Sequence, residues 1–143
     1  MGEHNYWSKH NLLHTSKNAP LIISAPGLKK NVKTDGIVEL LDIYPTLCEL
    51  AGIQIPQHLE GTSVVPLLQN PEQVGKKAAY TRWRNGASVT TTDFSYTEWD
   101  NKQRMLFDLK NDLDENINVA ENRNYKETVE ELSKLLNNNW DKQ

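Results

Sequence analysis

The sequence is poor in cysteine, in long hydrophobic runs and in net charge of either sign. Cys48 is the single cysteine of 143 residues, so an internal disulfide and a cysteine-based zinc cluster are excluded. The longest apolar runs, such as 37–41, fall far short of the roughly 20 residues that a membrane span needs, and we expect no signal peptide. Sixteen basic against 19 acidic residues give a formal charge of −3. Neither a nucleic acid nor a membrane is therefore an expected partner.

The first part of the chain alternates polar loops with short apolar segments. Residues 1–19 are polar and hold three of the four histidines, a composition typical of a loop that lines an active site. Residues 20–27 form a short apolar run bracketed by prolines and closed by Pro-Gly, which predicts a buried strand ending in a turn. A basic loop follows over 28–35.

Residues 42–52 carry the pattern of an amphipathic helix. Asp42 can cap the first turn, Pro45 falls in that turn where its missing N–H is harmless, and Gly52 can take the left-handed closing conformation. Cys48 is expected to pack within this helix as a small apolar residue. Four apolar side chains share one face at helical spacing and are expected to be buried. They are Ile43, Leu47, Leu50 and Ala51.

The second half of the chain changes to short runs with the composition of strands, separated by turn residues. These runs are 78–84, 87–91, 94–99 and 104–109. They predict an antiparallel meander of about four strands. Apolar residues then recur at helical spacing from Tyr125 to Leu136, so a C-terminal helix is expected to cover one face of the sheet.

Residue types alone point to little catalytic chemistry. His10 and His14 are four positions apart and would share a helical face, but Asn11 stands where a zincin has its glutamate. No serine occupies a G-x-S-x-G turn. We therefore expect no metal site and no nucleophile from these patterns.

Several sequence blocks, taken together, resemble the C-terminal third of type I sulfatases, the formylglycine-dependent family. In chain order they are Gly-Glu-His at 2–4, Trp-Ser-Lys at 7–9, Ala-Pro-Leu-Ile at 19–22, Pro-Gly at 26–27, Leu-Leu-Asp-Ile-Tyr-Pro-Thr-Leu at 40–47, Leu-Glu-Gly-Thr-Ser at 59–63, Tyr-Thr-Glu-Trp at 96–99 and Leu-Phe-Asp-Leu at 106–109. The likeness covers nearly all of the chain. Within the family, the chain looks most similar to the iduronate-2-sulfatase-like group.

The resemblance implies an α/β fold, namely the C-terminal portion of the sulfatase/alkaline phosphatase-like fold. Residues 1–75 would end the catalytic α/β domain, and 76–143 would form a small subdomain with the antiparallel sheet and the terminal helix. The implied reaction is hydrolysis of a sulfate ester at a formylglycine nucleophile beside a calcium ion. Lys9 matches the family's lysine, whose ammonium would stabilise charge on the transferring sulfuryl oxygens.

Further residues are expected to contact a sulfated sugar substrate. His10 and His14 lie on the same loop as Lys9, although His14 stands where many relatives have an acidic residue. Three neighbouring residues of the first predicted strand combine positive charge with an aromatic ring, which suits an anionic sugar. They are Arg82, Trp83 and Arg84.

The nucleophile that the family requires is missing from this sequence. Formylglycine is made from the Cys or Ser of C/S-x-P-x-R. Cys48 is followed two positions later by Leu50, and the Ser-Ala-Pro-Gly run at 24–27 ends at Leu28 instead of arginine. The family's calcium ligands would also precede the position of Met1.

We therefore expect the isolated chain to be inactive and to hold no cofactor itself, with calcium and formylglycine belonging to the full-length enzyme. An N-terminal sulfatase region, or self-association, would complete its fold. Relatives of this kind are exported or lysosomal, which makes a periplasmic, secreted or lysosomal parent protein the expectation.

Two other functions are compatible with the sequence. Aromatic residues of the predicted sheet can present their rings to sugars in a non-catalytic carbohydrate-binding module. They are Tyr80, Trp83, Tyr96 and Trp99. A related hydrolase of the alkaline phosphatase superfamily, acting on phosphate esters or phosphonates, would share the metal-centred fold.

Overall fold

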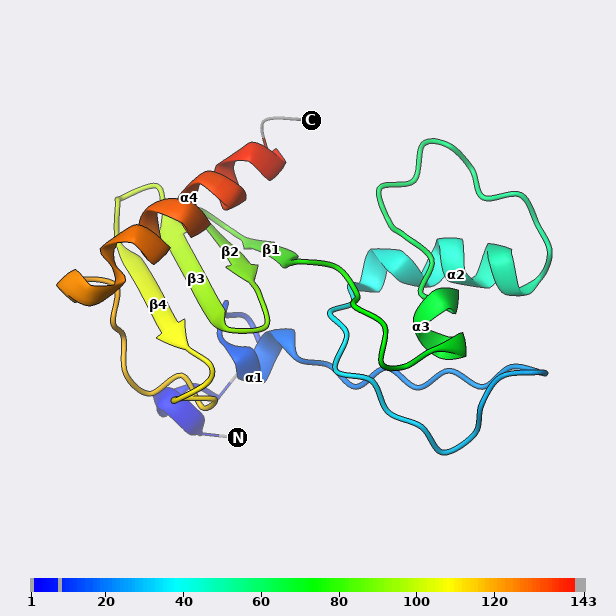
Figure 1. Cartoon of the computed structure of the whole chain (residues 1–143). Helices are drawn as coiled ribbons and strands as arrows, with labels where there is room; N and C mark the ends of the chain where they lie inside the picture. The colour runs from blue at the N-terminus through cyan, green and yellow to red at the C-terminus, as the bar shows by residue number, and fades with distance from the viewer. Residues whose placement is uncertain (1, 8, 141–143) are drawn as a thin grey trace. The chain divides into compact units, whose positions relative to one another are not determined.

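The computed structural model describes residues 2–7 and 9–140 and divides into two compact units (Figure 1). Unit 1 joins Met1–Pro20 to Tyr80–Gln143, and unit 2 is Leu21–Ala79. The chain thus leaves unit 1 after a short N-terminal segment and returns to it to build the sheet.

Unit 1 is built on a four-stranded sheet with the order β1-β2-β3-β4. The strands are β1 (Ala79–Trp83), β2 (Gly86–Thr90), β3 (Phe94–Trp99) and β4 (Arg104–Asp108). β3 is antiparallel to both of its neighbours, with Tyr96 opposite Val89 on β2 and opposite Leu106 on β4. The predicted meander is confirmed, since short alternating runs joined by tight turns pair with their sequence neighbours.

One face of the sheet is apolar and is covered by the C-terminal helix, as predicted. Val89, Tyr96 and Leu106 share this face and are completely buried. Figure 1 shows α4 (Lys126–Trp140) lying across the strands. The helix residues that are buried recur three and four positions apart, which is the spacing of one helical face. They are Val129, Leu132 and Leu136.

The opposite face of the sheet carries hydroxyl groups and is covered by the N-terminal segment. Leu12 is buried here, and α1 (His14–Lys17) follows it directly. Gly86 makes room for this packing, because a Cβ at that position would lie 2.5 Å from Nε1 of Trp99 and 2.9 Å from Cδ1 of Leu12. The sheet is therefore the middle layer of unit 1. Two 3₁₀ turns, η1 (Glu3–Asn5) and η3 (Arg123–Tyr125), complete the unit.

Unit 2 is organised around the buried carboxylate of Asp42. Its elements are η2 (Leu40–Asp42), α2 (Ile43–Leu50) and α3 (Val65–Gln69). The carboxylate accepts the N–H groups of Glu39 and Thr62, both at 2.8 Å. Lys76 supplies the counter-charge, with its Nζ 2.6 Å from Oδ1 of Asp42. These contacts tie the start of α2 to two later segments of unit 2.

The helix predicted over 42–52 is present, and Gly52 ends it with a φ of 67°, but the expected buried face is wrong. Leu47 is 57% exposed, whereas Pro45, Thr46 and Cys48 are buried. Thr46 faces inward because its hydroxyl donates to the carbonyl of Asp42 at 2.6 Å and accepts the N–H of Val64 at 2.9 Å. Hydrogen bonding, rather than apolar spacing, decides which face of α2 is buried.

The buried strand predicted at 20–27 is also wrong. Residues 20–25 lie in no strand or helix, and Ile22 is 91% exposed. A strand needs a neighbour for its N–H and C=O groups, and no other residue within 2–7 and 9–140 pairs with this segment. The apolar run is therefore an exposed segment without regular structure among the described residues.

Candidate functional site

Lys9 and His10 lie on an exposed part of the N-terminal segment, between η1 and the buried Leu12. The segment is held by contacts on both sides of these two residues. The hydroxyl of Tyr6 donates to the carbonyl of His10 at 2.7 Å, and Leu12 packs beside Gly86 on the sheet. Two reactive side chains are thereby presented from a short stretch that is anchored to the sheet.

His10 meets the turn between β1 and β2. Its imidazole stacks on the Trp83 indole, with ring centroids 4.8 Å apart and an angle of 7° between the planes. The Arg84 guanidinium carbon lies 5.7 Å from the centroid of the same indole. Arg84 has a φ of 53°, the left-handed conformation that a two-residue hairpin turn requires at its first position. The structure thus brings together three of the predicted site residues from two distant segments.

This cluster combines an indole with two nitrogen-bearing side chains that lie against its ring. A guanidinium above an indole is favoured by the ring quadrupole, and guanidinium N–H groups are well suited to planar or tetrahedral anions. With Lys9 one residue away from His10, the arrangement favours binding of an anionic group over binding of a cation.

Two predicted site residues have a different setting. His14 begins α1, where its N–H donates to Oε2 of Glu115 at 2.6 Å and its ring Nε2 lies 2.9 Å from Nδ2 of Asn18. These contacts hold the segment in place. Arg82 is exposed on β1, one position before Trp83.

Lys17 is an important residue that sequence reasoning missed. Its Nζ lies 2.9 Å from the Ser88 hydroxyl, 3.1 Å from that of Thr90 and 2.9 Å from that of Ser95. Burial lowers the pKa of Lys17 to about 8, and the negative charge of Glu115 opposes part of this shift. The only sequence signal for such a site is the alternation of hydroxyl residues along β2 and β3, which marks a polar sheet face.

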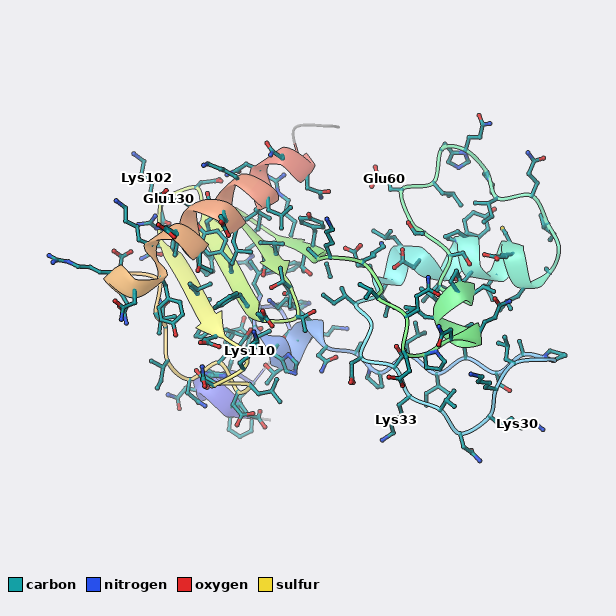
Figure 2. The ribbon with its side chains drawn as sticks, in the orientation of Figure 1. Lys30, Lys33, Glu60, Lys102, Lys110 and Glu130 are labelled. Carbon is teal, nitrogen blue, oxygen red and sulfur yellow. The ribbon has the colours of Figure 1, made fainter. Side chains whose placement is uncertain are left out.

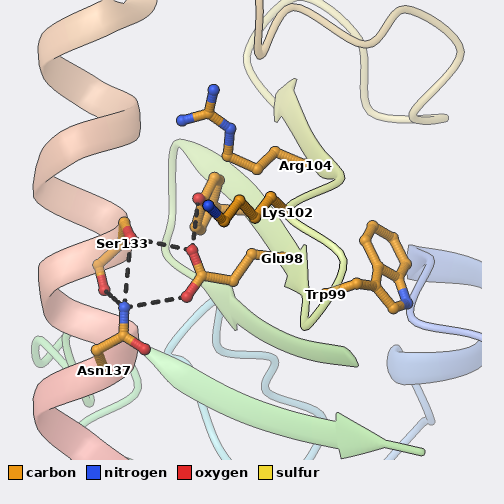
Figure 3. Close-up of a pocket in the computed structure, with 7 residues that line it drawn as sticks. Glu98, Trp99, Lys102, Arg104, Ser133 and Asn137 are labelled. Atoms are coloured by element: carbon orange, nitrogen blue, oxygen red, sulfur yellow. Dashed lines mark hydrogen bonds between the residues drawn. The ribbon is translucent and has the colours of Figure 1, made fainter. Parts of the chain in front are cut away.

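A groove lies on the other face of the sheet, between β3 and α4, with a volume of about 410 Å³. Figure 3 shows Glu98 pointing toward Ser133 and Asn137 of α4, whereas Trp99 points away. The Glu98 carboxylate accepts hydrogen bonds from Tyr96 at 2.8 Å, Ser133 at 2.9 Å and Asn137 at 3.0 Å. Burial first, and then the Glu98 carboxylate, raise the pKa of Tyr96. Glu98 therefore fastens the helix to the sheet.

The described residues contain no cluster of metal-ligating side chains. No three His, Cys, Asp or Glu side chains among them gather closely enough to hold an ion. None of the helices within 2–7 and 9–140 combines the length and the apolar character of a membrane span.

The chain is similar to sulfatases along nearly its whole length. The family model for the N-sulphoglucosamine sulphohydrolase C-terminal region matches residues 2–142. A sulfatase of Formosa agariphila is 34% identical over an alignment of 145 positions, which covers 99% of this chain and 29% of that protein. Arylsulfatase K of Gallus gallus is 31% identical over 150 residues, covering 94% of this chain and 28% of that protein.

A solved structure agrees with these relatives. BT1596, a 2-O GAG sulfatase, is 28% identical with a TM-score of 0.65 and covers 71% of this chain and 24% of its own. The chain spans less than a third of the length of the relatives that it matches. Because the family model extends over almost every residue, the chain belongs to the N-sulphoglucosamine sulphohydrolase C-terminal family, the C-terminal regions of sulfatases.

Proposed function

We propose that this chain is the C-terminal part of an enzyme that hydrolyses sulfate esters, and that Lys9 binds the sulfuryl oxygens. An ammonium fixed beside the transferring group stabilises the negative charge that builds up on those oxygens. The proposal rests on one observation above all, the stacking of His10 on Trp83 with Arg84 over the same ring. It unites the Lys9 segment with a second cationic segment more than 70 positions away.

The substrate that we propose is a sulfated sugar, with an iduronate-2-sulfatase-like preference for a 2-O-sulfate. The neighbour BT1596 is named a 2-O GAG sulfatase, which supports this class. His10, Trp83 and Arg84 would contact the sugar's anionic groups, with Arg82 and His14 as further contacts.

The nucleophile and the calcium ion of such an enzyme would come from outside the described residues. No C/S-x-P-x-R motif exists in the sequence, and no three His, Cys, Asp or Glu side chains within 2–7 and 9–140 gather as they would around an ion. The isolated chain is therefore expected to release no 4-nitrophenol from 4-nitrophenyl sulfate. Turnover by the purified chain would contradict this part of the proposal.

We further propose that a sulfatase N-terminal region packs on unit 2. Leu40, Tyr44 and Leu47 follow one another at helical spacing and are 74%, 54% and 57% exposed. Exposed apolar stripes of this kind mark interaction surfaces. The chain spans only 29% of the Formosa agariphila sulfatase, so such relatives contain the polypeptide that would cover the stripe.

Hydrogen exchange measured on the chain alone tests whether unit 2 lacks a partner that would cover it. Amides of residues 20–52 are expected to exchange much faster than those of β3, because part of their packing is missing. Slow exchange throughout 20–52 in a monomer would overturn the proposal. Protection that rises with protein concentration would identify self-association instead.

The role of Lys9 is tested by titrating the ¹⁵N-labelled chain with sodium sulfate at constant ionic strength. Amide shifts are expected around Lys9, His10 and Trp83, and they should be strongly reduced in Lys9→Met. Lys134→Met is the matched control, since Lys134 is exposed on α4, which covers the other face of the sheet. Equal shifts in wild type and Lys9→Met would refute the sulfate role.

The carbohydrate-binding module has less support from the geometry. Tyr96 is completely buried beneath α4 and donates to Glu98. Trp99 packs against Gly86, and His10 covers one face of Trp83. Rings used in this way do not form the exposed aromatic platform that sugar binding needs.

A further inference from the structure

The ammonium of Lys17 sits on the hydroxyl-bearing face of the sheet. Its three hydrogen-bond partners come from two adjacent strands, with Ser88 and Thr90 on β2 and Ser95 on β3. An ammonium has three N–H donors and no acceptor, so three hydroxyl acceptors match its capacity. A group bound from three directions has one position relative to the sheet, and this position also fixes the end of α1.

The start of α1 is fixed by a second buried group. The Glu115 carboxylate is only 2% exposed, and its Oε2 accepts the N–H of His14 at 2.6 Å. Its Oε1 is buried without a hydrogen-bond partner among the described residues. Glu115 itself has a φ of 56°, a rare conformation for this residue type. The single turn His14–Lys17 is thus held at both ends by charged side chains in low-exposure surroundings.

The contacts of Lys17 and Glu115 are more specific than the N-terminal segment would need merely to cover the sheet. Leu12 supplies the apolar packing, and an apolar residue at position 17 would cover hydroxyl groups at a lower desolvation cost than a lysine. A partly buried charge that is held by three hydroxyl groups defines geometry at the expense of stability. The residues whose geometry it would define are Lys9 and His10, which lie shortly before Leu12 in the chain.

We propose that Lys17 is a positioning residue, whose ammonium on the Ser88, Thr90 and Ser95 hydroxyls fixes the segment that presents Lys9 and His10 to an anionic substrate group. Lys17 does not touch the substrate. It acts through α1 and Leu12, and it sets the register in which His10 meets Trp83. The inference rests on the proposed function only for the identity of the ligand, because the stacking of His10 on Trp83 is observed independently.

The experiment uses the full chain and the His10–Trp83 contact as its spectroscopic signature. Lys17→Met keeps the length and the apolar stem of the side chain but removes the ammonium. We expect the β3–β4 amide pattern to persist, the nuclear Overhauser effect between the His10 and Trp83 rings to be lost, and sulfate binding to weaken about tenfold or more. Lys110→Met is the control, because Lys110, labelled in Figure 2, pairs with Asp93 at the surface of the same unit.

Chemical rescue separates positioning from a general loss of stability. In a Cys48→Ala background, Lys17→Cys is alkylated with 2-bromoethylamine, which rebuilds a lysine-like ammonium. Return of the ring contact supports the proposal. A contact that survives in Lys17→Met, or that rescue does not restore, overturns it. If the contact behaves as expected but wild type shows no sulfate shifts, the positioning role stands and the proposed function fails.

Discussion

Lys76 and Asp42 form an ion pair, with Nζ 2.6 Å from Oδ1, in which the aspartate is completely buried. Lys76 also pairs with Glu39 at 2.7 Å. Asp42→Asn is expected to destabilise unit 2 by about 3 kcal/mol, because it removes the negative charge of a completely buried side chain and leaves the partly exposed Lys76 ammonium with one carboxylate. Urea unfolding followed through amide exchange in α2 measures the loss. Glu39→Gln is the control and should cost clearly less, since Asp42 remains; equal losses would contradict the central role of Asp42.

The same cluster gives unit 2 a dependence on alkaline pH. Burial by itself lowers the pKa of Lys76, but its hydrogen bonds to Asp42 and Glu39 outweigh burial and raise that pKa above 10.5. A raised pKa in the folded state means that the stabilisation is complete below pH 10.5 and is lost as the pH rises through the folded-state pKa. Amide exchange in α2, corrected for the intrinsic rate, should therefore accelerate above pH 10.5 in wild type and far less in Lys76→Met.

Lys17 is expected to give unit 1 the opposite dependence of stability on pH. Its pKa is about 8 in the folded chain against 10.5 for a lysine in water, so the unfolded state binds more protons between these values. Stability of the sheet should consequently rise with pH across this window, by at most about 3 kcal/mol. Exchange of β3 amides at pH 8 and pH 10 measures the slope. Lys17→Met should abolish it and Lys110→Met should keep it; a slope that survives in Lys17→Met would show that another group titrates.

Gly86→Ala is expected to disturb the contact between the sheet and the N-terminal segment. A Cβ there would lie 2.5 Å from Trp99 and 2.9 Å from Leu12, so at least one of these side chains must move. Overpacking of this kind costs about 1–3 kcal/mol. Gly52→Ala is a useful comparison, because a Cβ at Gly52 meets nothing within 4 Å and only its φ of 67° is strained. If Gly86→Ala leaves the Leu12 methyl resonances unshifted, the close packing is absent.

The parts of the fold that sequence patterns predict are those in which each segment pairs with a neighbour in the chain. The strands near Tyr96 and the helix around Leu132 follow from alternation, turn residues and helical spacing. The segment at 20–27 and the face of α2 were misjudged for a different reason. The buried face of α2 is set in part by a contact distant in sequence, in which the N–H of Val64 donates to the Thr46 hydroxyl. Segment 20–27 pairs with no strand among the described residues. A local pattern contains neither fact.

The sequence suggests the residue types of the candidate site but not the contacts that hold these residues in place. Positive charge and an aromatic ring near Trp83 were visible in the sequence, and the stacking with His10 joins them to the Lys9 loop. Nothing local in the sequence marks Lys17 as a residue that contacts the sheet. Its partners lie more than 70 positions away on two strands. Only the folded sheet brings those hydroxyls together.

Glu98→Ala is expected to loosen α4 from the sheet. The substitution removes the shared acceptor of Tyr96, Ser133 and Asn137. The buried Tyr96 hydroxyl then loses its partner, which costs about 1–3 kcal/mol. Glu130→Ala is the matched control, since Glu130 is an exposed glutamate of α4 that faces Lys126 only at 4.0 Å.

Urea unfolding followed by circular dichroism compares the two variants, and amide exchange locates the effect. The loss in Glu98→Ala should be concentrated in α4 and in the β3 amides next to Tyr96, because these are the elements that the carboxylate joins. Glu98→Gln should recover part of the stability, since its carbonyl oxygen still accepts hydrogen bonds. A Glu98→Ala chain as stable as Glu130→Ala would mean that apolar packing by Val129, Leu132 and Leu136 is sufficient to hold the helix.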